Sequence, residues 1–143
     1  MLRQRIANSL ASLLMVTCGR WDFPDKIRAP RQRPGAFTMD GFVTIAREGD
    51  VPEGTGATFS VDDRLVALFH TIDGYRAIDD LCPHMGASLG SGALEGTVVS
   101  CPWHAWRFDV CSGNWVDNPK LHVASHEVRL EGNEIQVRLK TEI

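Results

Sequence analysis

Short apolar runs separated by turn residues make up most of the chain after residue 41. Segments 42–46, 65–70 and 75–78 contain aromatic and β-branched residues. Segment 51–56, with one proline and two glycines, follows the first run, and Asp73-Gly74 separates the other two. Short runs of this composition, bounded by turn residues, are typical of β-strands. This part of the pattern predicts antiparallel hairpins.

The C-terminal part shows an alternation of apolar and polar positions. Gly132-Asn133, a favourable two-residue turn, separates segment 125–130 from segment 134–140. The alternating apolar residues of these segments are Val128, Leu130, Ile135, Val137 and Leu139. Such alternation indicates a hairpin of two strands. With shorter runs at 57–61, 97–100 and 106–110, the pattern predicts an all-β antiparallel barrel or sandwich with almost no helix.

Two loops interrupt the strand pattern and carry the residues that can bind a metal. The first contains Cys82 and His84, and the second contains Cys101 and His104, so the spacing is C-x-H-x16-C-x2-H. A proline follows each cysteine and fixes the backbone torsion φ near −65°. Two facing loops that each supply one thiolate and one imidazole can bind a compact two-iron cluster from both sides.

The two loops and their flanks resemble the Rieske [2Fe–2S] family. Ile78-Asp79-Asp80-Leu81 precedes the first pair, Trp106-Arg107-Phe108-Asp109 follows the second, and the likeness extends from about residue 42 to residue 139. Within the family the chain is similar to small soluble Rieske ferredoxins and to small subunits of bacterial nitrite reductases. The resemblance implies a base of antiparallel strands with a small inserted cluster-binding subdomain, whose cluster loops lie at about 81–92 and 101–106.

The resemblance also implies the ligands and the chemistry of the site. Cys82 and Cys101 would bind one iron of a single [2Fe–2S] cluster per chain, and His84 and His104 would bind the other iron. The histidine-bound iron lies outermost in the family, so electrons would enter and leave at the two imidazoles. The cluster would carry one electron at a time, and no bond of a substrate would be made or broken.

Other positions near the two loops bear on the branch of the family. The respiratory branch has a further cysteine in each loop, joined as a disulfide, where this chain has Ala87 and Trp103. This difference favours the ferredoxin branch. The resemblance also implies that Trp103 and Trp106 shield the cluster and that a third loop, 117–119, covers it. Cys111 lies at a predicted turn and is expected to be a small buried residue.

A zinc site is the alternative for the same four residues. Structural zinc sites with two cysteines and two histidines usually have a C-x2-C pair followed by a histidine pair, whereas each half is mixed here. Thiolate and imidazole donors would still accept zinc. A non-redox zinc-binding interaction module is therefore the third candidate function, ranked after electron transfer.

The net charge of −3 conceals two parts of opposite sign. Residues 1–38 have a net charge of +5, and residues 39–143 have a net charge of −8. An acidic body is typical of small electron carriers that dock on a basic patch, although solubility alone would also explain it. It disfavours nucleic-acid binding. Beside the two predicted ligands only Cys18 and Cys111 remain, so no disulfide framework is expected.

Residues 1–38 are expected to be an N-terminal extension, disordered or weakly helical, before a Rieske domain at 39–143. Its alternatives are a dispensable segment before a true start at Met39, a basic amphipathic anchor, and a signal segment. The chain has no run of 18 or more apolar residues that would predict a transmembrane helix. Positions 3–5 are Arg-Gln-Arg rather than a twin arginine, so a cytoplasmic location is expected.

The function predicted from these residues is one-electron transfer between a reductase and a terminal oxygenase. The alternative is a redox small subunit of an assimilatory nitrite reductase or a similar complex. A complete Rieske oxygenase is not expected, because the 39 residues that follow His104 are too few for a catalytic domain with its own mononuclear iron. An electron-transfer protein or oxidoreductase subunit is favoured over a stand-alone enzyme.

The resemblance further predicts a low reduction potential. High-potential relatives place a serine hydroxyl on a cluster sulfur just after the glycine that follows the second histidine, whereas this chain has Ala105-Trp106 there. One hydrogen bond that stabilises negative charge is therefore missing. We expect a midpoint potential toward the lower end of the Rieske range of about −150 to +300 mV. Redox titration followed by EPR would measure it, and a value above about +200 mV would contradict the prediction.

Overall fold

The computed structural model describes residues 39–141, so the predictions for residues 1–38 lie outside the described residues. In chain order the elements are β1 (Val43–Arg47), β2 (Gly56–Val61), β3 (Arg64–Thr71), β4 (Gly74–Asp79), the 3-10 helix η2 (Leu89–Ser91), β5 (Ala93–Glu95), β6 (Val98–Ser100), β7 (Arg107–Asp109), β8 (Ser125–Glu131) and β9 (Glu134–Arg138). The all-β prediction is confirmed. The apolar pattern misses η2 and β5, because the segment from Gly90 to Gly96 contains three glycines and forms no apolar run.

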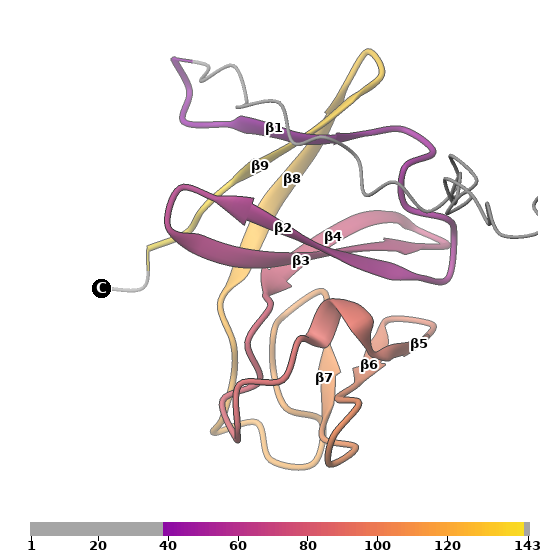
Figure 1. The fold of residues 1–143 in the computed structure, drawn as a ribbon, viewed down its shortest axis with the longest axis vertical. Helices are drawn as coiled ribbons and strands as arrows, with labels where there is room; N and C mark the ends of the chain where they lie inside the picture. The colour runs from indigo at the N-terminus through magenta and orange to yellow at the C-terminus, as the bar shows by residue number, and fades with distance from the viewer. Residues whose placement is uncertain (1–38, 142–143) are drawn as a thin grey trace, which may run out of the picture.

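The strands form two antiparallel sheets, one at each end of the molecule (Figure 1). The larger sheet has six strands in the order β1-β9-β8-β4-β3-β2, and the smaller sheet has three in the order β5-β6-β7. The edge strands β1 and β2 contact each other, so the larger sheet curls into a nearly closed barrel, which we call the base. Residues 81–124, the cluster subdomain, lie between β4 and β8 and are the predicted insertion.

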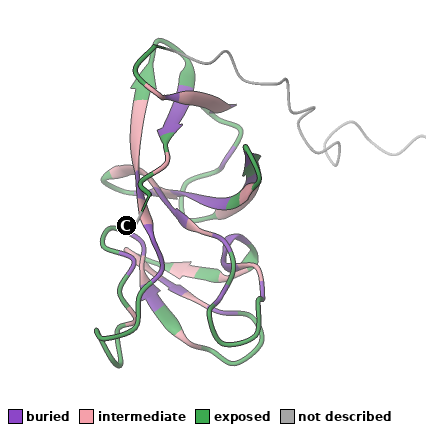
Figure 2. Ribbon diagram, turned by 90° about the vertical axis from the view of Figure 1, so that its left-hand side faces the viewer, coloured by how far each residue is buried: buried purple, intermediate pink, exposed green. Residues whose placement is uncertain are grey.

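Strand β3 joins the base to the cluster subdomain because both of its faces are buried. Successive side chains of a strand point to opposite faces. Val66 and Leu68 therefore face the core of the base, whereas Ala67 and Phe69 face a second core that includes Leu89 of η2. All five side chains are fully buried. Figure 2 shows exposed residues in the loops and turns along the whole length of the molecule.

The C-terminal hairpin forms as the alternation predicts, but only part of its apolar face is buried. Val128 pairs with Val137, and Leu130 pairs with Ile135. Ile135 and Val137 are fully buried in the base, whereas Leu130 is 48% exposed. Leu130 lies one residue before the end of β8, and the β8–β9 turn extends beyond the other strands of the base (Figure 1).

Candidate metal centre

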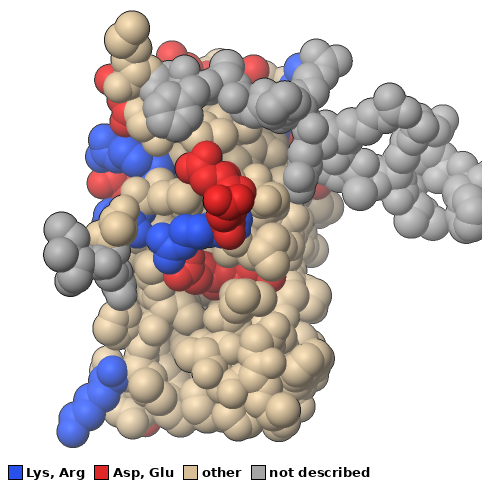
Figure 3. All heavy atoms as spheres, turned by 60° about the vertical axis from the view of Figure 1, so that its left-hand side comes forward, with Lys and Arg blue, Asp and Glu red and all other residues tan. Residues whose placement is uncertain are grey.

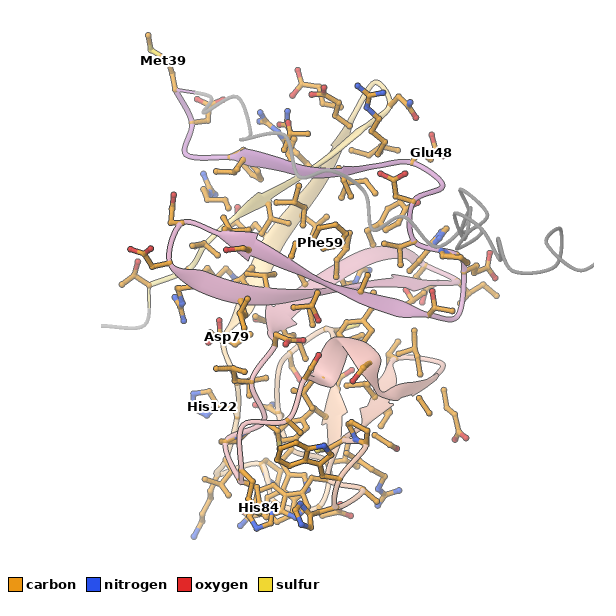
Figure 4. All side chains as sticks on the ribbon, viewed as in Figure 1. Met39, Glu48, Phe59, Asp79, His84 and His122 are labelled. Carbon is orange, nitrogen blue, oxygen red and sulfur yellow. The ribbon has the colours of Figure 1, made fainter. Side chains whose placement is uncertain are left out.

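The first cluster loop is a tight backbone turn that begins at Cys82. The Cys82 N–H donates to the Ala87 carbonyl at 2.9 Å, and the Gly86 N–H donates to the Cys82 carbonyl at 2.7 Å. Gly86 has a φ of 76°, in the left-handed region that glycine adopts without steric cost. The turn places His84 at the tip of the cluster subdomain, at the opposite end of the molecule from Glu48 (Figure 4).

The second cluster loop repeats this turn at Cys101. The Cys101 N–H donates to the Trp106 carbonyl at 2.7 Å, and the Ala105 N–H donates to the Cys101 carbonyl at 2.9 Å. Ala105 therefore occupies the position that Gly86 has in the first loop, with a φ of 57°. An alanine in this region costs about 1–2 kcal/mol, because its Cβ approaches the following carbonyl oxygen.

The two cysteine thiols form an inner pair. Cys82 and Cys101 are 2% and 3% exposed, and they belong to the core that joins the cluster subdomain to β3. Burial raises the pKa of the Cys82 thiol, and the neighbouring Cys101 thiol raises it further, against backbone hydrogen bonds that lower it. Because a metal binds the thiolate form, metal binding at Cys82 would release the proton of its thiol.

The two imidazoles form an outer pair. His84 and His104 are exposed, and their Nδ1 atoms face each other at 3.2 Å. Their ring centroids are 4.5 Å apart, and the ring planes meet at 79°. Two imidazole nitrogens at about 2.0–2.1 Å from one tetrahedral ion would lie about 3.4 Å apart. The observed spacing fits two nitrogens that share one metal ion.

The four donors thus form one thiol pair and one imidazole pair. Among residues 39–141, no three His, Cys, Asp or Glu side chains gather into a single group around one ion. A Rieske cluster has two thiolates on one iron and two imidazoles on the other. The residues present fit that division of ligands between two irons.

A stack of three aromatic rings supports the outer pair from one side. Trp106 lies parallel to the His84 ring, with centroids 4.6 Å apart and an interplanar angle of 14°. Trp115 stacks on the other face of Trp106 at 4.0 Å and 6°. Trp103 is 60% exposed and is not part of this stack, so its shielding of the site stays a prediction. Trp115 was missed by sequence reasoning, because its contact with the second loop is made only in the folded chain.

A third loop is fixed to β7 beside this stack. The Val116 N–H donates to the Arg107 carbonyl at 2.8 Å, and the Arg107 guanidinium pairs with Asp117 at 2.5 Å. The hydrogen bond from Arg107 holds the pKa of the Asp117 carboxyl below its usual value. The predicted loop 117–119 is exposed along its length. Trp115, just before it, makes the ring contact with the second loop.

Cys111, His70 and His126 are not part of the two pairs. Cys111 is exposed, so the prediction of a buried residue is wrong; the turn after β7 carries its side chain to the surface. His70 lies in the base, with Nδ1 2.9 Å from the Val51 carbonyl oxygen. His126 is buried, with Nε2 3.0 Å from Asp79, and burial lowers its pKa.

Comparison with known proteins gives consistent results. A family model described as the Rieske [2Fe–2S] domain matches residues 41–133. The ferredoxin component of a naphthalene 1,2-dioxygenase system of Pseudomonas aeruginosa is 33% identical over 91 residues, which is 63% of this chain and 88% of that protein. Ferredoxin CarAc of Metapseudomonas resinovorans is 34% identical over 73 residues, 50% of this chain and 68% of that protein.

Solved structures show the same fold. The ferredoxin of carbazole 1,9a-dioxygenase from Nocardioides aromaticivorans IC177 superposes with a TM-score of 0.65 at 31% identity, covering 69% of this chain and 98% of that one. A protein described as a nitrite reductase small subunit from Mycobacterium tuberculosis gives a TM-score of 0.64 at 26% identity, covering 70% and 96%.

The inserted subdomain and its paired cysteine–histidine loops define an iron–sulfur protein of the Rieske class. With the family model matching more than half of its length, the chain belongs to the Rieske [2Fe–2S] family. The resemblance and the [2Fe–2S] cofactor inferred from the sequence are confirmed. None of the helices in the described residues is both long and apolar enough to cross a membrane.

The strain at Ala105 gives a testable prediction. Ala105→Gly should stabilise the protein by about 1 kcal/mol, because glycine adopts the left-handed conformation without the Cβ contact. The measurement is the denaturant midpoint of the cluster-loaded protein, with unfolding monitored by circular dichroism and by visible absorbance. Ala93→Gly, in strand β5, is the control and should instead destabilise by about 0.5–1 kcal/mol. Destabilisation by both variants would refute the assignment of strain to Ala105.

Proposed function

We propose that Cys82 and Cys101 hold the inner iron of the [2Fe–2S] cluster and that His84 and His104 hold the outer iron. The pairing of thiol with thiol and of Nδ1 with Nδ1 supports this assignment. It also weighs against the zinc module, because one tetrahedral zinc would need all four donors around a single point. We further propose that residues 39–143 are the Rieske domain and residues 1–38 are an extension.

The protein's own residues arrange the site for transfer of single electrons. The bound cluster supplies a one-electron couple between Fe(III)/Fe(III) and Fe(II)/Fe(III). The buried thiols of Cys82 and Cys101 keep the inner side of the site away from water. His84 and His104 reach the surface, where a partner can approach their ring edges closely. Trp106 holds the His84 ring in one orientation through their parallel contact.

The relatives indicate the kind of partner. Several are ferredoxin components of dioxygenase systems, and one solved structure, 29% identical with a TM-score of 0.64, is a complex of oxygenase and ferredoxin in carbazole 1,9a-dioxygenase. We assign this chain the same role, a carrier between a reductase and a terminal oxygenase. The second candidate function is a redox small subunit of a nitrite reductase, because the chain is also similar to nitrite reductase small subunits.

We also propose a cytoplasmic location. Cys111, which is not a proposed ligand, is an exposed free thiol. Free thiols persist in the reducing cytosol, whereas an oxidising compartment favours disulfides. Fractionation of cells that express the full chain would test the location.

The surface around the imidazoles differs from the rest of the molecule. The exposed large apolar side chains of the cluster subdomain are Leu81, Met85, Trp103, Val116 and Leu121. Figure 3 shows charged side chains gathered over the base and few at the cluster end. Of the net charge of −8 on residues 39–143, residues 81–124 carry only −1. The acidic body predicted from the sequence is therefore mainly the base, and a partner that covers the imidazoles meets an apolar surface.

The cluster assignment is tested by EPR of the anaerobically purified, dithionite-reduced protein, with iron, sulfide and zinc measured on the same sample. We expect a rhombic signal at two irons per chain with an average g below that of all-cysteine clusters. Cys101→Ser should abolish it, whereas Cys111→Ser, the matched control, should leave it unchanged. A silent sample with one zinc per chain would refute the redox function. Product formation by naphthalene dioxygenase components that lack their own ferredoxin would separate the carrier from the nitrite reductase subunit.

The apolar surface gives a prediction for docking. Trp103→Ala should weaken association with a terminal oxygenase by about tenfold or more, because exposed tryptophans commonly dominate interface energies. The effect should depend little on salt, since few charges lie beside the imidazoles. Ile72→Ala is the control: Ile72 is 82% exposed in the β3–β4 turn of the base, and its removal should leave the Kd unchanged. Equal Kd values for wild type and Trp103→Ala would refute the proposed docking surface.

A further inference from the structure

Asp80 is a buried carboxylate at the entrance to the first cluster loop. It follows β4 directly, precedes Cys82 by two residues and is 1% exposed. Burial of a carboxylate is costly unless hydrogen bonds replace the lost water. The proposed electron transfer at the ring edges of His84 and His104 does not involve this residue.

Three donors converge on one oxygen atom of Asp80. Its Oδ1 accepts from the Thr58 hydroxyl at 2.9 Å, from the Ser88 hydroxyl at 3.0 Å and from the Gly90 N–H at 2.8 Å. An ionised carboxylate is an acceptor only, so an oxygen that takes three donors is suited to negative charge. Thr58 belongs to β2 of the base, whereas Ser88 and Gly90 belong to the returning arm of the first cluster loop. The carboxylate thus fastens this loop to the base.

The backbone around Asp80 strengthens the same junction. Its N–H donates to the Leu65 carbonyl at 3.0 Å, and its carbonyl accepts from the Leu89 N–H at 2.7 Å. A Cβ on Gly90 would lie 2.6 Å from Thr58 Oγ1 and 3.0 Å from Asp80 Oδ1. Only glycine allows the loop to approach the carboxylate closely enough for the N–H bond.

Asp80 lies two residues before the proposed ligand Cys82, and no cation of the described residues forms an ion pair with it. The ion pairs found within residues 39–141 do not include Asp80, whereas its neighbour Asp79 pairs with Arg64 at 2.8 Å. Two residues of extended chain span at most about 7 Å, so Asp80 is close to Cys82. Charges in a protein interior are screened less than charges in water.

We propose that Asp80 positions the first cluster loop and lowers the reduction potential of the cluster. The inference rests on the proposed role of Cys82 as a ligand. Reduction adds one negative charge to the cluster, and a fixed negative charge nearby opposes that addition. The hydroxyl groups of Thr58 and Ser88 direct their positive ends at the carboxylate. They partly offset its field and so act on the potential in the opposite direction.

Paired substitutions test this electrostatic role. Asp80→Asn keeps the size of the side chain and removes its charge, so the midpoint potential should rise. Thr58→Val removes one donor, leaves the charge less offset and should lower the potential. Ser88→Ala should also lower it, and this variant keeps the test decisive if Asp80→Asn does not fold. A loosened loop without an electrostatic role would move all three variants in the same direction, which would overturn the proposal.

The controls separate this inference from the proposed function. Asp63→Asn removes an exposed charge in the β2–β3 turn and should leave the potential unchanged. Cluster content and the rhombic EPR signal are measured first in every protein, and their absence from wild type would refute the proposed function itself. An intact cluster with an unchanged potential in Asp80→Asn would overturn only the role of Asp80. Loop positioning is tested by chelator-driven cluster loss, which Asp80→Asn should accelerate about tenfold; an unchanged rate would overturn that part.

Discussion

The two backbone turns that begin at Cys82 and Cys101 are the constraint on which the site depends. Each turn uses the cysteine N–H and carbonyl to close the loop, which leaves the thiol buried while the histidine stays at the surface. Two such turns, facing each other, separate a thiol pair from an imidazole pair. One loop repeats the closure with alanine in a left-handed conformation, a strained backbone of the kind that is retained at functional sites.

The base makes these turns rigid. Cys82 and Cys101 belong to the same core as Phe69 of β3 and Leu89 of η2, so the two cluster loops rest on a strand whose opposite face packs in the core of the base. A closely packed core contains few voids, so the side chains of the two turns have little room to move. A tightly held site limits the rearrangement that accompanies a change in charge, which suits a protein that gains and loses an electron repeatedly.

Charge and apolar surface are divided between the two ends of the molecule. The base carries most of the negative charge, and the cluster end exposes apolar side chains around His84 and His104. The charge of the base can speed and orient the encounter with a partner. Apolar contact close to the imidazoles can then hold the complex briefly without removing charged side chains from water, which is costly. This arrangement suits a carrier that must bind two different partners in turn.

The sequence by itself determined the all-β class and the four candidate ligands, and its resemblance to the Rieske family implied the inserted subdomain. Strand alternation, turn residues and the cysteine–histidine spacing are local features, so they are visible in a linear chain. Only the tertiary structure decided what surrounds the ligands. It placed Trp115 on Trp106, left Trp103 and Cys111 exposed, and brought Thr58 and Ser88 to Asp80. These contacts join residues distant in sequence, and their geometry follows from how the loops pack on β2 and β3.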